Sequence, residues 1–70
     1  MLTPNEIGDI ALKYLEKNDI AADFSVCGDG YCQINFKIGE NEDWIKLRRF
    51  TSTLSVVRTI KSTLKTKGAN

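Results

Sequence analysis

Two neighbouring segments in the middle of the chain alternate between apolar and polar residues, and this alternation restricts the possible folds more than any other feature. The apolar positions are Ala22, Phe24 and Val26 in the first segment and Cys32, Ile34, Phe36 and Ile38 in the second. A period of two is typical of strands with one buried face. The Gly-Asp-Gly sequence at residues 28–30 is typical of a tight hairpin loop. We therefore predict an antiparallel hairpin that buries one face.

The length of the hairpin loop decides which residues face each other. A three-residue loop with Gly30 at a positive φ pairs Cys27 with Tyr31. It also brings together the apolar pairs Val26 and Cys32, Phe24 and Ile34, and Ala22 and Phe36. A two-residue turn at residues 29–30 would shift the register by one and mix polar with apolar side chains on both faces. The sequence therefore predicts the three-residue loop.

A third strand is expected over residues 44–50, after a turn at residues 39–42. Its inner face consists of Ile45 and Leu47, and its outer face of Trp44, Lys46, Arg48 and Phe50. Pairing Ile38 with Ile45 would set Lys37 against Lys46, a repulsive contact. Pairing Phe36 with Ile45 instead sets Lys37 against Trp44, so we prefer this register.

The first residues carry the signals of a helix start. Thr3 and Glu6 have the spacing of a capping box, and Pro4 suits the first helical position. Apolar residues then recur at helical spacing at Ile7, Ile10, Ala11, Tyr14 and Leu15. We predict a helix over residues 4–17 that ends at residues 18–19.

The last part of the chain also fits a helix. The Thr-Ser-Thr sequence at residues 51–53 offers N-caps, and a buried stripe is expected at Leu54, Val57, Ile60 and Leu64. Leu54, Val56 and Ile60 also fit a strand, but the length of the segment and its lysine-rich end favour a helix. The prediction is one α+β domain over residues 1–70: a helix, a three-stranded antiparallel meander and a helix, with both helices on one face of the sheet. Residues 67–70 are expected to fray.

This order of elements is similar to that of double-stranded-RNA-binding domains. That family has a lysine cluster at the start of its last helix, where this chain has Thr-Ser-Thr at residues 51–53. The first strand loop carries an acid, Asp29, where that family presents a minor-groove reader. The resemblance therefore concerns the order of helices and strands, which alone does not imply a function.

Charge is distributed very unevenly along the chain. Residues 1–43 hold three lysines and nine carboxylates, a net charge of −6, whereas residues 44–70 hold seven cations and no acid. A basic segment of this kind is typical of proteins that bind polyanions. The net charge of +1 thus conceals two opposed halves.

The sequence lacks the residues of the common catalytic sites. It has no histidine, which excludes a Ser-His-Asp triad and a histidine-ligated metal. In the predicted hairpin Cys27 and Cys32 point to opposite faces, so they do not form a disulfide. We expect no enzyme, no cofactor, no metal and no small-molecule substrate. Without an apolar run of about 20 residues or a secretory signal, a cytoplasmic protein without a membrane partner is expected.

The basic half suggests a nucleic-acid interface. Aromatic rings among cations on an open sheet face suit stacked bases, and long cations flanked by small hydroxyls on a helix suit a phosphate backbone. The candidate residues are Lys37, Trp44, Lys46, Arg48, Arg49, Arg58, Lys61 and Lys65. The alternative is a small interaction or inhibitor protein whose charged poles dock on an acidic surface of another protein. A monomer or a weak homodimer is expected in either case.

Overall fold

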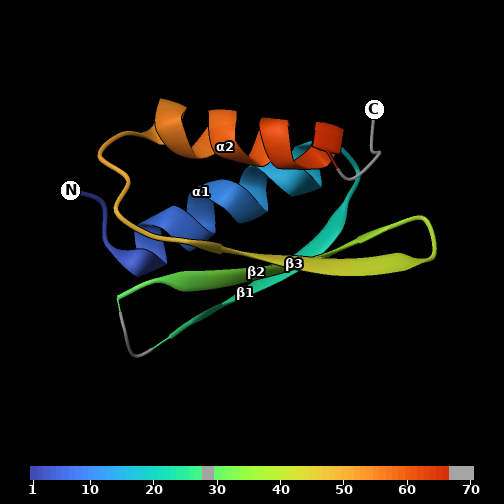
Figure 1. Ribbon diagram of the computed structural model, residues 1–70, viewed down its shortest axis with the longest axis horizontal. Helices are drawn as coiled ribbons and strands as arrows, with labels where there is room; N and C mark the ends of the chain where they lie inside the picture. Colours follow the sequence, from blue (N-terminus) through green and yellow to red (C-terminus); the bar gives the residue numbers. More distant parts are fainter. Residues whose placement is uncertain (28–29, 67–70) are drawn as a thin grey trace.

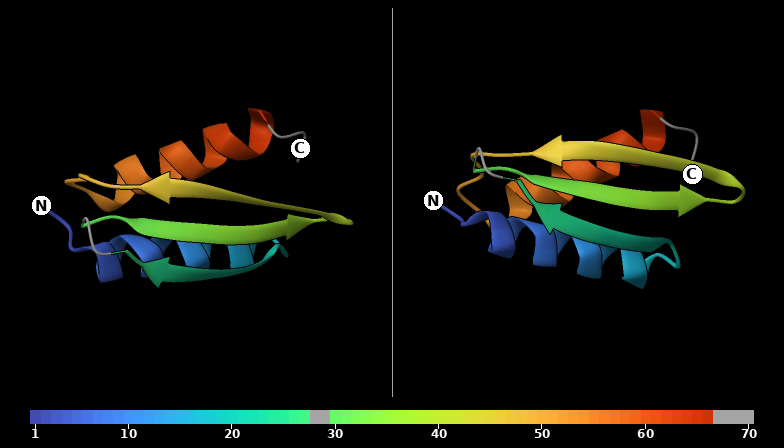
Figure 2. Two further views of the ribbon diagram at one scale, coloured as in Figure 1. Left: turned by 60° about the horizontal axis from the view of Figure 1, so that its bottom comes forward. Right: turned by 90° about the horizontal axis from the view of Figure 1, so that it is seen from below.

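The computed structural model describes residues 1–27 and 30–66 and has the predicted order of elements (Figure 1). The elements are α1 (Pro4–Lys17), β1 (Ala21–Val26), β2 (Cys32–Ile38), β3 (Asn41–Leu47) and α2 (Thr53–Thr66). The strands form one antiparallel sheet in the order β1-β2-β3. Both helices lie on the same face of it, as Figure 2 shows, so the predicted fold class is confirmed. The expected fraying of residues 67–70 and the first two loop residues, 28–29, lie outside the described residues.

Both ends of α1 are closed by the local hydrogen bonds that their residues favour. The Glu6 amide donates to Thr3 Oγ1 at 3.1 Å, and the Thr3 amide donates to Glu6 Oε1 at 2.9 Å, so the predicted capping box is confirmed. At the other end Asp19 has a φ of 60°, and the Ile20 amide donates to the carbonyl oxygen of Leu15 at 2.9 Å. These are the features of a Schellman ending. The helix is thus limited to residues 4–17 by its sequence.

The hairpin of β1 and β2 has the predicted register. Phe24 lies opposite Ile34, and the Cys27 amide donates to the carbonyl oxygen of Tyr31 at 2.8 Å. Gly30 has a φ of 78°, as expected for the last position of the loop. The match of apolar residues across the two strands was therefore sufficient to determine their pairing.

The predicted extent and register of the third strand were wrong. β3 begins and ends three residues earlier than expected, at Asn41 and Leu47. Ile45 pairs with Ile34, whereas the preferred register paired it with Phe36 and the alternative with Ile38. The inner face of the sheet therefore continues past its apolar residues to Asp43, which is only half-buried.

The turn between β2 and β3 explains this register. Ile38 pairs with Asn41, so the connection is only two residues long. Gly39, its first residue, has a φ of 61°, which suits the first central position of a type II′ turn. The short turn draws the acidic residues 41–43 into the strand and sets Glu42 opposite Lys37. The pair of opposite charges, Lys37 and Glu42, thereby replaces the expected pairing of Lys37 with Trp44.

The core lies between the sheet and the two helices. Its buried apolar side chains are those of Ile7, Ala11, Leu15, Cys32, Ile34, Phe36, Leu47, Val56, Ile60 and Leu64. Half-buried Phe24 lies against α1 at Gly8, where an added Cβ would overlap its ring. Val26 faces inward by register but is 48% exposed, because it is the last residue of an edge strand.

α2 is a helix, as predicted, but its buried stripe is displaced. Ser52 caps it, accepting a hydrogen bond from the Ser55 amide at 3.2 Å. Val56 is fully buried, whereas Leu54, expected in the core, is 58% exposed and Val57 is half-buried. The stripe therefore runs through the helix positions 56, 60 and 64, which are separated by four residues each.

Candidate nucleic-acid interface

The face of the sheet away from the helices carries a cluster of two aromatic rings and a lysine, Tyr31, Trp44 and Lys46, here called the sheet-face cluster. Trp44 and Lys46 are two residues apart on β3 and so point to the same side. Lys46 Nζ lies 5.0 Å from the centre of the Tyr31 ring and 5.7 Å from that of the Trp44 ring. Both distances are those of cation–π contacts. Trp44 remains 53% exposed, so part of its ring is open to solvent.

A row of polar side chains continues from this cluster across the sheet. Gln33 Nε2 donates to Asn35 Oδ1 at 2.9 Å, and Asn35 Nδ2 donates to Asp23 Oδ1 at 3.1 Å. Asn35 lies opposite Asp23 on β1 and opposite Trp44 on β3. The hydrogen bonds therefore hold the amides and the carboxylate in fixed positions on the open face.

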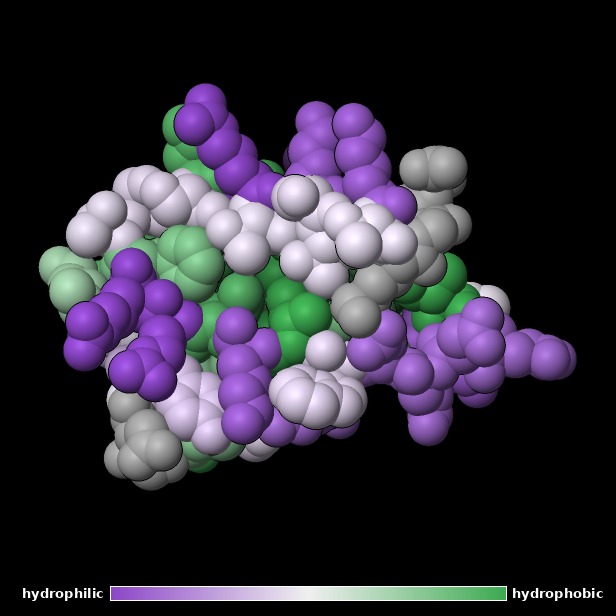
Figure 3. All heavy atoms as spheres, viewed as in Figure 1, coloured by the Kyte–Doolittle hydropathy of each residue, from purple (hydrophilic) through white to green (hydrophobic). Residues whose placement is uncertain are grey.

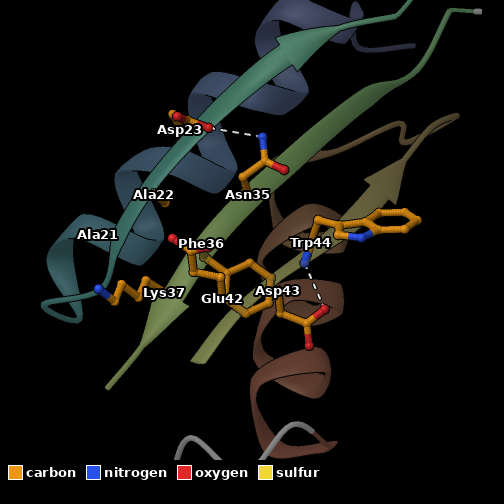
Figure 4. A pocket seen from close by; sticks show the side chains of 9 residues that line it. All are labelled: Ala21, Ala22, Asp23, Asn35, Phe36, Lys37, Glu42, Asp43 and Trp44. Atoms are coloured by element: carbon orange, nitrogen blue, oxygen red, sulfur yellow. Dashed lines mark hydrogen bonds between the residues drawn. The ribbon is translucent and has the colours of Figure 1, made fainter. Parts of the chain in front are cut away.

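The open face is hollowed next to Trp44 (Figure 4). The hollow has a volume of about 580 Å³ and is lined by Ala21, Ala22, Asp23, Asn35, Phe36, Lys37, Glu42, Asp43 and Trp44. Ala21, on the open face of β1, is small and leaves the space, and the longer side chains of β2 and β3 form its sides. In Figure 4 the indole of Trp44 extends away from Asn35 and Asp23, so the polar groups that border the hollow are the amide of Asn35 and the carboxylate of Asp23, and the ring lies to one side of them.

The two consecutive arginines lie in the connection between the sheet and α2, not on the outer face of the strand. β3 ends at Leu47, and Arg49 has a φ of 60°, so the chain turns immediately after the strand. Phe50, predicted to lie on the outer face, instead packs against the core, and its carbonyl oxygen accepts a hydrogen bond from the Leu2 amide at 2.9 Å. Arg48 and Arg49 are both exposed at this end of the sheet.

The cations of α2 lie on another surface. Arg58, Lys61 and Lys65 are exposed, whereas the buried stripe of the helix belongs to the core, on the helical side of the sheet. These three side chains therefore point away from the face that carries Trp44 and Lys46. In the part of the chain that the structure describes, none of the three has a carboxylate within ion-pairing distance.

The eight predicted residues are thus divided between two surfaces. The structure brings together Trp44 and Lys46, with the two arginines following along the chain. Lys37 is on the same face but near the other end of β2, opposite Glu42. The α2 cations are on the helical side. Lys67, which belongs to the same basic run, lies outside the described residues.

Sequence reasoning missed two acidic residues of the open face, Asp23 and Glu42. The alternation of β1 already indicated the position of Asp23, because its neighbours Ala22 and Phe24 face inward. Nothing comparable indicated Glu42, which was assigned to a turn. The open face is consequently less basic than the sequence suggested.

The described residues were also compared with the requirements of a reactive thiol, a metal site and a membrane span. Cys32 is fully buried, and its desolvation, followed by the nearby Cys27, raises the pKa of its thiol. Residues 1–27 and 30–66 contain no group of three acidic, cysteine or histidine side chains placed to hold a metal ion. Neither helix of this part of the chain is long and apolar enough to cross a membrane.

No protein-family model, no curated protein and no solved structure matches the chain. The function is therefore inferred from the geometry of the chain's own residues.

Proposed function

We propose that this protein is a small, non-enzymatic nucleic-acid-binding module whose single-stranded ligand lies across the open face of the sheet. The observation that supports this proposal is the sheet-face cluster, in which an exposed indole and a phenol flank one lysine. Proteins that bind single strands combine aromatic rings for the bases with cations for the phosphates. The cluster supplies both within one short stretch of sheet.

The bases of the ligand would stack on the rings and fill the hollow beside them. Each stacked base contributes about 1–3 kcal/mol. A base in the hollow would meet the amide of Asn35 and the carboxylate of Asp23, whose positions are fixed by their mutual hydrogen bond. Carboxylates accept from the exocyclic amino groups of bases, so the acid on this face is compatible with a base edge.

The phosphates of the ligand would follow β3 towards its end. Lys46, Arg48 and Arg49 are exposed there and follow one another closely in the chain. Three contacts to a single strand predict that log K falls with log salt with a slope of about −2. The cations of α2 face away, so in this proposal they attract the ligand at long range without touching it.

Intrinsic fluorescence provides a direct test, because the chain has a single tryptophan and it belongs to the proposed site. Single-stranded DNA and RNA oligomers, and a duplex of the same sequence, are titrated into the protein at about 50 mM salt. We expect single strands to quench Trp44 and to bind more tightly than the duplex. Trp44→Ala, followed by oligomer anisotropy, is expected to weaken single-strand binding about tenfold and duplex binding less.

Two variants with the same change in net charge distinguish direct contact with the nucleic acid from its long-range electrostatic attraction. Lys46→Glu changes the sheet-face cluster, and Lys65→Glu makes the same change in net charge on the helical side. We expect Lys46→Glu to weaken binding about tenfold and Lys65→Glu at most about threefold. Equal losses would contradict the assignment to the sheet face, and a wild-type protein that binds no oligomer would refute the function.

A protein partner is the second candidate, and the positions of the charges favour it. Glu40 and Glu42 are exposed at one end of β3, and Arg48 and Arg49 at the other, about 20 Å away along the strand. Two separate poles of opposite charge suit docking on a protein surface of complementary charge. If no oligomer binds at low salt, pull-downs with variants of each pole become the next experiment.

The proposal places the protein in the cytoplasm. Cys27 and Cys32 are free thiols whose side chains belong to opposite faces of the hairpin, so they are not positioned to form a bridge. Unbridged cysteines suit a reducing compartment.

A further inference from the structure

β3 is an edge strand, and within residues 1–27 and 30–66 its outer backbone groups are not paired with another strand. Ile38 and Asn41 flank the two-residue turn, so they form a hydrogen-bonded pair and the ladder alternates from there. The backbone groups of Glu42, Trp44 and Lys46 consequently point away from β2. The Trp44 amide agrees with this, since it donates to Asp43 Oδ1 at 2.8 Å.

The charges of β3 are complementary to those of its own antiparallel copy. When two copies are aligned about Trp44, all seven residues of the strand overlap. Glu42 then lies opposite the partner's Lys46, and Lys46 opposite the partner's Glu42. The two Trp44 side chains meet at the centre, on the open face of the sheet. No pair in this alignment joins like charges.

We propose that β3 pairs with β3 of a second copy of this chain about a two-fold axis at Trp44, which joins the two sheets into one. The residues whose backbone groups point outward are the ones that exchange hydrogen bonds across the axis. The Trp44 amide exchanges its hydrogen bond to Asp43 Oδ1 for one to the carbonyl of the partner's Trp44, so the amide stays hydrogen-bonded. This pairing does not depend on nucleic-acid binding.

β1, the strand at the other edge of the sheet, is less suited to pairing with its own copy. The described strand β1 has one charged residue, Asp23, so its antiparallel copy offers no cation to pair with it. Pairing β1 of one copy with β3 of another would be head-to-tail and would lead to a ring or an open filament of copies, not to a symmetric dimer. Pairing of β3 with β3 of a second copy gives a closed dimer with two-fold symmetry.

A strip of apolar surface beside β3 also favours this edge as the site of pairing. Figure 3 shows it in the middle of one face of the molecule, between α2 and β3. Ile45, on the inner face of β3, is only half-buried. A partner strand laid along β3 would cover this strip, and an exposed edge strand with apolar residues is a template for pairing with another chain.

A second alignment, displaced by two residues, is also free of like-charge pairs. It places Glu42 opposite the partner's Arg48 and Trp44 opposite the partner's Lys46. The two alignments respond differently to an exchange of charges between positions 42 and 46, which restores attraction only in the alignment about Trp44.

Sedimentation velocity without nucleic acid tests the proposal, from about 10 µM to 1 mM protein, the range of weak association. We expect the wild type to dimerise with rising concentration, and Glu42→Lys or Lys46→Glu to weaken the dimer at least tenfold, since each reversal creates two repulsive pairs. Lys65→Glu, a control with the same change in charge as Lys46→Glu, should dimerise like the wild type.

The decisive sample is an equimolar mixture of the Glu42→Lys and Lys46→Glu chains, each checked for folding by circular dichroism. In the mixture every charged pair across the axis is attractive again, so we expect a heterodimer as tight as the wild-type dimer. The double variant with both reversals should dimerise by itself. A monomeric wild type at 1 mM, or a mixture that does not associate, would overturn the proposal. Oligomer binding by a monomeric protein would leave the proposed function intact, so the two failures are distinguishable.

Discussion

Gly8→Ala is expected to destabilise the protein although alanine is the better helix former. Gly8 is buried in the middle of α1, where the exchange would ordinarily contribute about 1 kcal/mol to stability. A methyl group at this position, however, would overlap the Phe24 ring, with Cγ only 2.7 Å from the ideal Cβ. Ring atoms cannot yield as the end of a flexible chain can, so β1 must move away from the helix or the ring must leave its place.

The magnitude follows from the balance of these two effects. Overpacking of a close contact costs about 1–3 kcal/mol, against a gain of about 1 kcal/mol from helix propensity. We expect Gly8→Ala to lower the free energy of unfolding by about 1 kcal/mol, which lowers the Tm of a domain of this size by about 4–8 °C. Urea denaturation monitored by circular dichroism at 222 nm measures it.

The same exchange in a Phe24→Ala background is the control. Without the ring the methyl group meets no obstacle, so Gly8→Ala should then stabilise the protein by up to about 1 kcal/mol. The double-mutant cycle should give a coupling of about 2 kcal/mol. If Gly8→Ala stabilised the wild type, or if the cycle were additive, the close packing of Phe24 on α1 would be refuted.

Three further predictions concern the helix ends and the thiols. Asp19→Gly should stabilise the protein by up to about 1 kcal/mol in urea denaturation, because glycine adopts the positive φ without strain; an unchanged midpoint would argue against that strain. The pKa of Glu6 is lowered, chiefly by the hydrogen bond from the Thr3 amide, so the stability it contributes is complete above the ordinary value of 4.5 and is lost as the pH falls through the lower folded-state pKa. Glu6→Gln should reduce this loss in thermal melts at acidic pH, and an identical pH profile would count against the capping box. An aromatic disulfide reagent should modify half-buried Cys27 in the native protein and Cys32 only after unfolding, since burial shields Cys32 and raises the pKa of its thiol; two equally fast thiols would contradict this.

The elements predicted best are those whose signals are local. The capping box of Thr3 and Glu6 requires only neighbouring residues, and the structure contains both of its hydrogen bonds. The register of β1 and β2 was fixed by the coincidence of two apolar sets on either side of a short loop. In both places the chain offers no second arrangement that satisfies the same residues.

The buried stripe of α2 shows where local signals fail. Leu54 and Val56 are both apolar and both fit a helical pattern that includes Ile60 and Leu64. The choice between them depends on where α1 and the sheet contact the helix, which periodicity does not reveal. The structure buries the smaller Val56 and exposes Leu54.

The register of β3 determines which side chains are neighbours in the candidate site. Ile45 has an apolar residue to face in several registers, so the core alone did not distinguish between them, and the positive φ of Gly39 selected the shortest turn. That turn sets Lys37 opposite Glu42 and Asn35 opposite Trp44, where we had expected Lys37 beside Trp44. The cations that follow one another in the sequence therefore lie in three places in the structure. One lysine lies between two rings on the sheet, two arginines follow the end of β3, and the others lie on α2. Binding by this protein should consequently depend on where a charge lies more than on how many there are, and the comparison of Lys46→Glu with Lys65→Glu measures that difference, since both variants have the same net charge.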